Sequence, residues 1–218
     1  MGEFAVGQSV PREEDPRLLT GGGEYLDDVN LRDQAWGYVL RSPHGIAHIR
    51  SIDTTMAREA PGVLAVLTGA DWAAEGYGSL PCEDLAKTRS DGSPIFHPHY
   101  PALVPDTARY VGDYVAFVVA ETRTQARDAA EMIEVDYEPV PAVPTIESAL
   151  ADGATAIWPG CSDNVSFFEE KGDKAAVDQA FARADHIVNR SLINNRVTAV
   201  AMEPRGCVGD YDARQGRY

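Results

Sequence analysis

Residues 114–138, YVAFVVAETRTQARDAAEMIEVDYE, decide the fold class of this chain. They open with Val115 to Ala120, an apolar run of strand length that is typical of a strand buried on both faces. Thr122 and Gln125 then have the spacing of a helix capping box. The apolar positions that follow recur at helical spacing: Ala126, Ala129, Ala130 and Ile133. Residues 134–138 read as another strand, so the stretch predicts a strand, a helix and a strand, and a mixed fold of the α/β or α+β type.

The residues before this stretch predict further strands. In residues 34–41 a strand is expected, because Trp36, Tyr38 and Leu40 alternate with Ala35, Gly37, Val39 and Arg41. Ser42-Pro43-His44 interrupts the alternation, and residues 48–52 are expected to form the partner strand. A short helix is expected next, followed by a strand at residues 63–67. Between residues 68 and 106 the periodicity disappears, which predicts a long surface excursion with one short helix near Ala70. Loops of that length tend to carry a function or to meet a partner.

The residues after it indicate a second region. Three prolines within residues 139–144 form a connector, and we place a domain boundary after Pro144. Beyond it, Asp173 is expected to cap a helix with one apolar stripe. Strands are expected at residues 164–171, 186–195 and 206–211. The sequence ends in what resembles the opening residues of another strand, which predicts a sheet completed by further polypeptide.

Composition excludes several classes of protein. The chain has 19 basic and 34 acidic residues and a formal net charge of −15, so nucleic acid and anionic membranes repel it. Three widely spaced cysteines, Cys82, Cys161 and Cys207, include no Cys-x-x-Cys pair, which argues against an iron–sulfur or zinc site and for free thiols in a reducing compartment. Neither a signal peptide nor an apolar run of about 20 residues is visible, so a cytoplasmic protein without membrane insertion is expected.

Few residues stand out as candidates for chemistry. His97-Pro98-His99 is the one close histidine pair, and with Asp91 or Cys82 it would make a weak metal site; an ordinary loop is the alternative. Three glycines, Gly21 to Gly23, lack the strand, helix and lysine of a phosphate loop and are expected to form a flexible turn. Neither a serine nor a cysteine nucleophile has a recognisable activating neighbourhood.

A tetrad near the end of the chain is a further candidate. Met202-Glu203-Pro204-Arg205 separates two segments expected to be strands. An acid and a base on either side of a proline are typical of a structural corner with a local ion pair. The residues alone leave a structural and a functional interpretation open.

Several blocks, taken together and in order, resemble the molybdopterin-binding large subunit of the xanthine dehydrogenase, aldehyde oxidase and carbon monoxide dehydrogenase family. They run from PREEDPRLLTGGGEYLDD at residues 11–28, through RSPH at 41–44, PGV at 61–63 and LTGAD at 67–71, to RYVGD at 109–113, VDYEP at 135–139 and MEPR at 202–205.

The resemblance implies an α+β architecture: an α/β-hammerhead domain with an N-terminal arm over residues 1–144, and an incomplete start of the molybdopterin-binding domain over residues 145–218. It further implies an oxidoreductase whose molybdenum cofactor hydroxylates carbon centres, with electrons leaving through iron–sulfur clusters, commonly to FAD, in partner subunits. The expected partners are therefore the remainder of the large subunit and the iron–sulfur and flavin subunits.

No catalytic, cofactor-binding or metal residue of the family maps onto this sequence. A structural or interface role is therefore expected for the chain, with Met202, Glu203, Pro204 and Arg205 as positions of that kind, and the isolated chain is expected to lack a complete active site. Two other hypotheses remain open. One is a self-sufficient binding or scaffold module on a hammerhead fold, and the other is a small metal-dependent enzyme that uses His97 and His99.

Overall fold

The computed structural model describes residues 11–81, 88–89 and 92–218, and the chain divides into two compact units. One unit lies within residues 35–187, and the other joins residues 11–34 with residues 188–218. The strands are β1 (Trp36–Arg41), β2 (Ala47–Asp53), β3 (Val63–Thr68), β4 (Thr107–Ala108), β5 (Tyr114–Ala120) and β6 (Glu134–Pro139). The helices are α1 (Asp15–Leu19), a 3₁₀ turn at Leu26–Asp28, α2 (Thr55–Glu59), α3 (Gly69–Glu75), α4 (Arg123–Glu131), α5 (Ile146–Ala149) and α6 (Lys174–Ala182).

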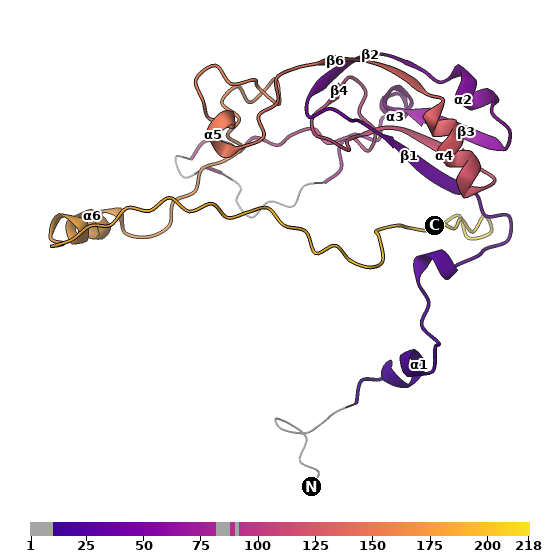
Figure 1. Ribbon diagram of the computed structural model, residues 1–218, viewed down its shortest axis with the longest axis horizontal. Coiled ribbons are helices and arrows are strands. Elements are labelled where there is room, and N and C mark those ends of the chain that lie inside the picture. Colours follow the sequence, from indigo (N-terminus) through magenta and orange to yellow (C-terminus); the bar gives the residue numbers. More distant parts are fainter. Residues whose placement is uncertain (1–10, 82–87, 90–91) are drawn as a thin grey trace, which may run out of the picture. The chain divides into compact units, whose positions relative to one another are not determined.

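Two antiparallel three-stranded sheets form the larger unit (Figure 1). In the first sheet β5 lies between β1 and β3, and Val115, Ala116 and Val118 are buried, as the apolar run predicts. In the second sheet β2 lies between β4 and β6. The expected pairing of residues 48–52 with the preceding strand is therefore wrong, because this segment pairs with β6 from much later in the chain.

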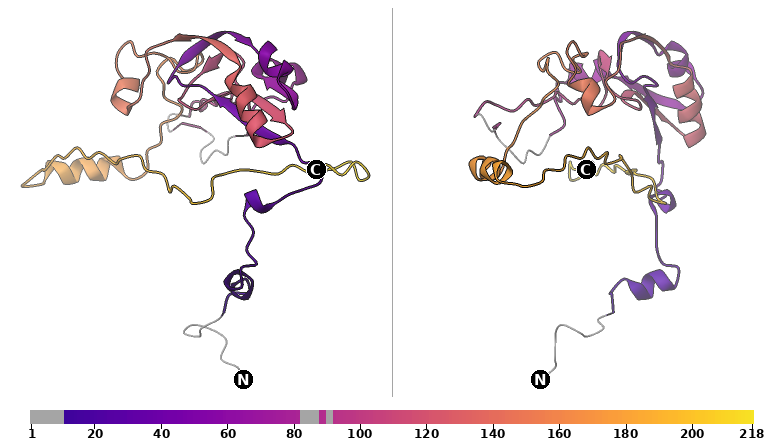
Figure 2. Two further views of the ribbon diagram at one scale, coloured as in Figure 1. Left: turned by 45° about the vertical axis from the view of Figure 1, so that its right-hand side comes forward. Right: turned by 60° about the vertical axis from the view of Figure 1, so that its left-hand side comes forward.

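Helix α4 joins the two sheets along the chain. It follows β5 of the first sheet and precedes β6 of the second, so the predicted strand, helix, strand succession is confirmed but is not a parallel βαβ unit. Since both sheets are antiparallel, the mixed fold is of the α+β type. Figures 1 and 2 show α4 alongside the first sheet, where it packs against β1 and β5.

The core of the larger unit lies where the predicted apolar face of α4 meets this sheet. Ala129 and Ala130 of α4 are buried together with Val66 of β3 and Val118 of β5. The oxygen of Thr122 accepts a hydrogen bond from the backbone N–H of Gln125 (3.2 Å), so the expected N-cap is confirmed. The reciprocal bond differs from a standard capping box, because the Gln125 side chain accepts from the Thr122 hydroxyl.

After the proline connector, the predicted helix cap is confirmed and the predicted strands are wrong. Asp173 caps α6 as expected, accepting from the backbone N–H of Ala176 (2.9 Å). The strands expected at residues 164–171, 186–195 and 206–211 are wrong, since none of these segments forms a strand. A strand requires a neighbour that takes up its backbone donors and acceptors. Residues 167–211 are exposed and pair with no strand among the residues that the structure describes.

The smaller unit contains the glycines expected to form a turn. Gly21 has a left-handed φ of 79°, and the N–H of Gly22 donates to the carbonyl of Arg17 (2.8 Å), so this stretch ends α1 as a turn. Within the described part of the chain, no helix combines the length and apolar character needed to cross a membrane.

Candidate functional site

The candidate site begins at the turn between β4 and β5, the RYVGD stretch. Asp113 is buried, and its two carboxylate oxygens accept from the backbone N–H groups of Arg109 (2.9 Å) and Tyr114 (3.0 Å). Gly112 has a φ of 93°, which a side chain would strain, and its N–H donates to the carbonyl of Ser42 (2.8 Å). Because the turn is held from within and from Ser42, it presents Arg109 and Tyr110 in a fixed arrangement.

Arg109 connects this turn to a distant loop. Its guanidinium lies over the indole ring of Trp158, 3.9 Å from the ring centroid. Its Nε donates to the carbonyl of Ile157 (3.1 Å) and its Nη1 to the carbonyl of Thr107 (3.0 Å). Burial lowers the pKa of Arg109, while the charges of Asp106 and Asp113 act in the opposite direction. An arginine remains protonated under such conditions, so a partly buried positive charge lies beside the indole.

Asn164 shapes the loop that carries Trp158. It has a left-handed φ of 55°, which asparagine tolerates better than most residues. Its side-chain oxygen accepts from the N–H of Ile157 (2.9 Å), and its amide nitrogen donates to the carbonyls of Ala149 and Thr155 (both 3.0 Å). One side chain therefore satisfies three backbone groups of this loop and fixes the position of Trp158.

The same loop binds the long surface excursion. The N–H of Phe96 donates to the carbonyl of Ser166 (2.9 Å), and the Ser166 hydroxyl donates to the carbonyl of Phe96 (2.8 Å). Nearby, Arg89 donates to the carbonyl of Val165 (2.6 Å).

Cys161 is buried in this loop, and burial raises the pKa of its thiol, which makes it unreactive near neutral pH. The expectation of free thiols is met by Cys161 and Cys207, while Cys82 lies outside the described residues.

Two tyrosines form the opposite side of the site. The hydroxyls of Tyr100 and Tyr110 are hydrogen-bonded to each other, and their rings are nearly parallel, with centroids 6.5 Å apart and an angle of 10°. The pKa of Tyr110 is raised well above its ordinary value, first because burial disfavours the phenolate, and further by the bond to Tyr100 and the charge of Asp113. The Tyr110 phenol therefore stays protonated and acts as a neutral hydrogen-bonding group.

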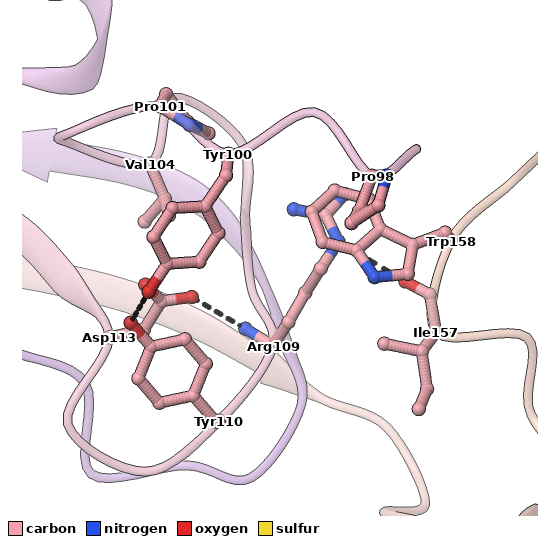
Figure 3. A pocket seen from close by; sticks show the side chains of 9 residues that line it. All are labelled: Pro98, Tyr100, Pro101, Val104, Arg109, Tyr110, Asp113, Ile157 and Trp158. Carbon is pink, nitrogen blue, oxygen red and sulfur yellow. Dashed lines mark hydrogen bonds between the residues drawn. The ribbon is translucent and has the colours of Figure 1, made fainter. Parts of the chain in front are cut away.

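A cavity of about 270 Å³ lies between these groups (Figure 3). Figure 3 shows the tyrosine pair on one side and the indole of Trp158 on the other, with the Arg109 side chain rising between them. Pro98, Pro101 and Val104 complete the lining together with Ile157 and Asp113. The cavity wall is therefore mostly aromatic and apolar, with a guanidinium and two phenols as its polar groups.

The tetrad of the sequence analysis lies elsewhere, in the smaller unit. Glu203 accepts a hydrogen bond from the backbone N–H of Leu26 (2.7 Å), at the start of the 3₁₀ turn. Met202 is fully exposed. Arg205 takes part in none of the ion pairs found among residues 11–81, 88–89 and 92–218, so the corner there is held by a bond from Glu203 to the backbone.

Among the residues that the structure describes, the histidine pair belongs to no cluster of metal ligands. Over the described ranges, no group of three or more histidine, cysteine, aspartate and glutamate side chains is close enough to hold a metal ion. Asp91 and Cys82, the ligands considered in the sequence analysis, lie outside those ranges. Pro98, between the two histidines, lines the cavity instead.

Sequence reasoning did not single out this cavity. The RYVGD stretch stood out only as a block of family resemblance. Trp158 belongs to no motif or periodic pattern that would mark it as a site residue. Nothing in a local pattern links Arg109 with a tryptophan so far along the chain. The asparagine in a turn-rich stretch was the one available clue, since asparagine often supports such loops.

Comparison with known proteins identifies the family of this chain. Two family models match the chain: "Aldehyde oxidase and xanthine dehydrogenase, a/b hammerhead domain" over residues 20–141, and "Molybdopterin cofactor-binding domain" over residues 157–218. The first match alone covers more than half of the chain. The chain therefore belongs to the aldehyde oxidase and xanthine dehydrogenase family, and the resemblance seen in the sequence is confirmed.

Individual relatives agree with this. The nicotine 6-hydroxylase large subunit of Paenarthrobacter nicotinovorans is 38% identical, and the match covers 97% of this chain and 25% of that protein. The carbon monoxide dehydrogenase large chain of Afipia carboxidovorans is 33% identical, over 97% of this chain and 26% of that protein. The chain thus spans about a quarter of the length of these relatives.

Solved structures show the same likeness. Quinoline 2-oxidoreductase from Pseudomonas putida 86 has a TM-score of 0.58 and 40% identity, over 69% of this chain and 18% of that one. A carbon monoxide dehydrogenase from Oligotropha carboxidovorans has a TM-score of 0.68 and 34% identity, over 83% of this chain and 22% of that one.

Proposed function

We propose that this chain supplies the hammerhead domain and the start of the cofactor-binding domain in the large subunit of a molybdenum hydroxylase. The order of the two family matches, residues 20–141 and then 157–218, carries the proposal. We place the domain boundary after Pro144, giving domains at residues 1–144 and 145–218. The gap between the two matches and the proline connector both support it.

Its role in that enzyme is structural and interfacial. The described residues do not fit a molybdenum cofactor by themselves, because residues 166–211, most of the part that matches the cofactor-binding domain, are exposed. The cavity described above has its lining in residues 98–158 and holds no cluster of metal ligands. We therefore assign neither a catalytic nor a cofactor-binding residue to this chain. Met202, Glu203, Pro204 and Arg205 are proposed as interface positions, supported by the exposure of Met202 and by the bond from Glu203 to the backbone of Leu26.

The partners follow from the same proposal. The molybdenum cofactor is held by the assembled large subunit and supplies the oxidation chemistry, while iron–sulfur and flavin subunits take up the electrons. Relatives named as large subunits or large chains of such enzymes support this arrangement. The acidic surface and the sparse cysteines support a cytoplasmic complex.

The substrate class that we propose is a nitrogen-containing aromatic ring. Two relatives whose names state such substrates, nicotine 6-hydroxylase and quinoline 2-oxidoreductase, are 38% and 40% identical to this chain. The carbon monoxide dehydrogenases are 33% and 34% identical. This difference in sequence identity is small, but it makes heteroaromatic rings the first substrates to screen.

The test is purification of the native assembly through a tag on this gene in the cell that expresses it. The expected result is co-purification with iron–sulfur and flavin subunits, about one molybdenum per large subunit, and dye reduction with a heteroaromatic substrate. A metal-free protein that purifies without partners would contradict the proposal and favour the stand-alone binding or scaffold module. Molybdenum without turnover of heteroaromatic rings would contradict the substrate class alone.

A further inference from the structure

We propose that the cavity between the tyrosine pair and the Arg109–Trp158 pair is an accessory binding site for a small, planar, uncharged heteroaromatic molecule. The site lies in the hammerhead part of the chain and in the loop that follows it, and it needs no metal. It goes beyond the proposed function and does not depend on it, because every group that makes it belongs to residues 98–158.

The shape and size of the cavity set the first requirement. Its volume of about 270 Å³ lies just under the range of roughly 300–1,000 Å³ for sites that enclose drug-sized ligands. A molecule of one or two rings fits such a space. Tyr100 and Tyr110 remain 41% and 38% exposed, so the cavity opens to solvent and a ligand can enter without displacing buried chain. Aromatic walls on two sides favour a flat molecule over a branched one.

The polar groups set the second requirement. Two nitrogens of the Arg109 guanidinium, Nε and Nη1, donate to backbone carbonyls. The third, Nη2, has no hydrogen bond to any other residue in the described part of the chain and remains a donor. On the other wall, the paired hydroxyls of Tyr100 and Tyr110 supply a second hydrogen-bonding group. A ligand with an acceptor on its ring, such as a ring nitrogen or a carbonyl, matches this arrangement.

The local charge decides between a neutral and an anionic ligand. Asp106 and Asp113 both act electrostatically on Arg109, so two carboxylates oppose one guanidinium. Asp113 is buried at the base of the cavity and is held by two backbone N–H groups. A carboxylate or phosphate ligand would meet a net negative environment, and the hydrogen bond that it gained from Arg109 would be offset by repulsion. A neutral acceptor gains the same hydrogen bond without that repulsion.

Three tryptophans make the test site-specific. The chain contains Trp36, Trp72 and Trp158 alone, so the indole N–H region of a ¹H–¹⁵N spectrum has three signals, which Trp→Phe variants assign. The purified 218-residue chain is titrated with quinoline, which is planar and uncharged near neutral pH. The expected result is a saturable shift of the Trp158 signal, with the other two signals unchanged. An unmoved Trp158 signal at millimolar quinoline, or equal movement of all three signals, would overturn the proposal.

Trp72 and Tyr77 provide a matched control. Their rings lie 4.9 Å apart at the surface, so they offer aromatic stacking without the cavity or the arginine. Tyr100→Ala removes one wall and is expected to weaken quinoline binding by roughly two- to ten-fold, the range of an aromatic contact. Tyr77→Ala is expected to leave binding unchanged. Equal effects of the two variants would show general stacking on exposed rings and would overturn the site.

Two further ligands test the chemistry. Naphthalene has the shape of quinoline without its nitrogen and is expected to bind more weakly at the same sub-millimolar concentration. Quinoline-2-carboxylate adds a negative charge and is expected to bind more weakly than quinoline. Equal binding of naphthalene would overturn the assignment of Arg109 as a donor, and tighter binding of the carboxylate would overturn the preference for an uncharged ligand. None of these measurements uses molybdenum or turnover, so their failure is distinct from failure of the proposed function.

Discussion

At the scale of single residues, Arg109 and Asn164 do the most to hold the site together. Arg109 contacts two parts of the chain, β4 through Thr107 and the distant loop through Ile157 and Trp158. Asn164 satisfies the backbone of the loop that Arg109 reaches. Both side chains act through planar groups with fixed hydrogen-bonding geometry, which a flexible substitute does not reproduce.

Replacement of Arg109 by lysine is expected to loosen the Trp158 loop. Lysine keeps the charge but loses the flat guanidinium and one of the two bonds to carbonyl oxygens, at a local cost of about 1–2 kcal/mol. Amide exchange of Ile157 and Cys161 should therefore quicken by roughly ten-fold. Arg12→Lys, at an exposed arginine paired with Glu14, is the control and should leave these amides unchanged. Unaltered amide exchange in the Arg109 variant would show that Asn164 alone is enough to hold the Trp158 loop in place.

Gly69 is expected to tolerate no side chain. A Cβ at this position would lie 2.2 Å from the carbonyl oxygen of Val104, and backbone there cannot move without disturbing the buried chain around it. Gly69→Ala should therefore lower the free energy of unfolding by about 1–3 kcal/mol. Gly209→Ala, where a Cβ would meet nothing within 4 Å, is the matched control and should change it little. Urea unfolding followed by circular dichroism measures both, and equal midpoints would contradict the close contact.

Sequence reasoning at this scale recovered caps and missed contacts. Thr122 and Asp173 were predicted as N-caps because a cap lies within four residues of the backbone group that it serves. Arg109 and Trp158 could not be paired, because their contact depends on how the chain folds between them. Local chemistry is visible in a sequence, whereas a contact between distant segments is not.

At the scale of elements, the short helices depend on their first turns. α4 packs its alanine face on the first sheet, and Thr122 satisfies an N–H that the helix itself leaves unbonded. α3 begins in a similar way at Thr68, where Asp71 reaches back to the cap. Because α4 packs on the first sheet, weakening its cap should lower the stability of the whole unit.

The cap of α4 is tested by two threonine-to-alanine changes. Thr122→Ala removes the bond to the N–H of Gln125 and should cost about 1 kcal/mol. Thr124→Ala, at an exposed position inside the same helix, should be neutral or slightly stabilising because alanine is the better helix former. Chemical denaturation measures the free energy of unfolding of both variants. A Thr122→Ala variant as stable as Thr124→Ala would show that packing alone maintains α4.

The cap of α3 should make stability depend on pH. The side chain and the backbone N–H of Thr68 both donate to Asp71 and hold the pKa of that carboxyl below its ordinary value. A carboxyl with a lower pKa when folded contributes stability above its unfolded pKa and loses it as the pH falls through the folded pKa. The Asp71 side chain is 45% exposed, so the contribution should stay under about 1 kcal/mol.

Comparison of wild type with Asp71→Asn isolates this contribution. Asparagine still accepts hydrogen bonds from Thr68 but carries no charge, so the difference in unfolding free energy should narrow as the pH falls from about 5 to about 2. Urea titrations across this range measure it. A difference that stays constant with pH would show that the charge of Asp71 is irrelevant to α3.

Elements were predicted where the pattern was strong and the partner lay within the chain. The apolar run of β5 and the helical spacing of α4 are confirmed, since each buries its apolar side chains in one core. Pairing was predicted less well, as β2 pairs with β6 and not with β1. The segments at residues 186–195 and 206–211 have apolar side chains typical of strands but pair with no strand in the described part of the chain, so they form no sheet.

At the scale of the whole molecule, apolar side chains are distributed unevenly. The larger unit buries its apolar residues between α4 and the first sheet. In the smaller unit, Leu192, Ile193 and Val197 are 88–91% exposed on backbone that pairs with no strand in the described part of the chain. Extended apolar segments with free backbone groups tend to associate with one another.

Association of the isolated chain should therefore arise from this segment. A lysine at position 193 places a charge in the middle of the exposed run, and charges on free edges oppose pairing between chains. Ile193→Lys should reduce concentration-dependent association in sedimentation velocity, while its thermal unfolding should stay within about 0.5 kcal/mol of wild type because the side chain contacts no core. Leu19→Lys, at an equally exposed leucine of α1, is the control and should leave association unchanged. If both variants reduced association alike, general surface charge would explain the effect. If neither variant reduced it, this segment would not mediate association, and the stand-alone module would become the better account of this chain.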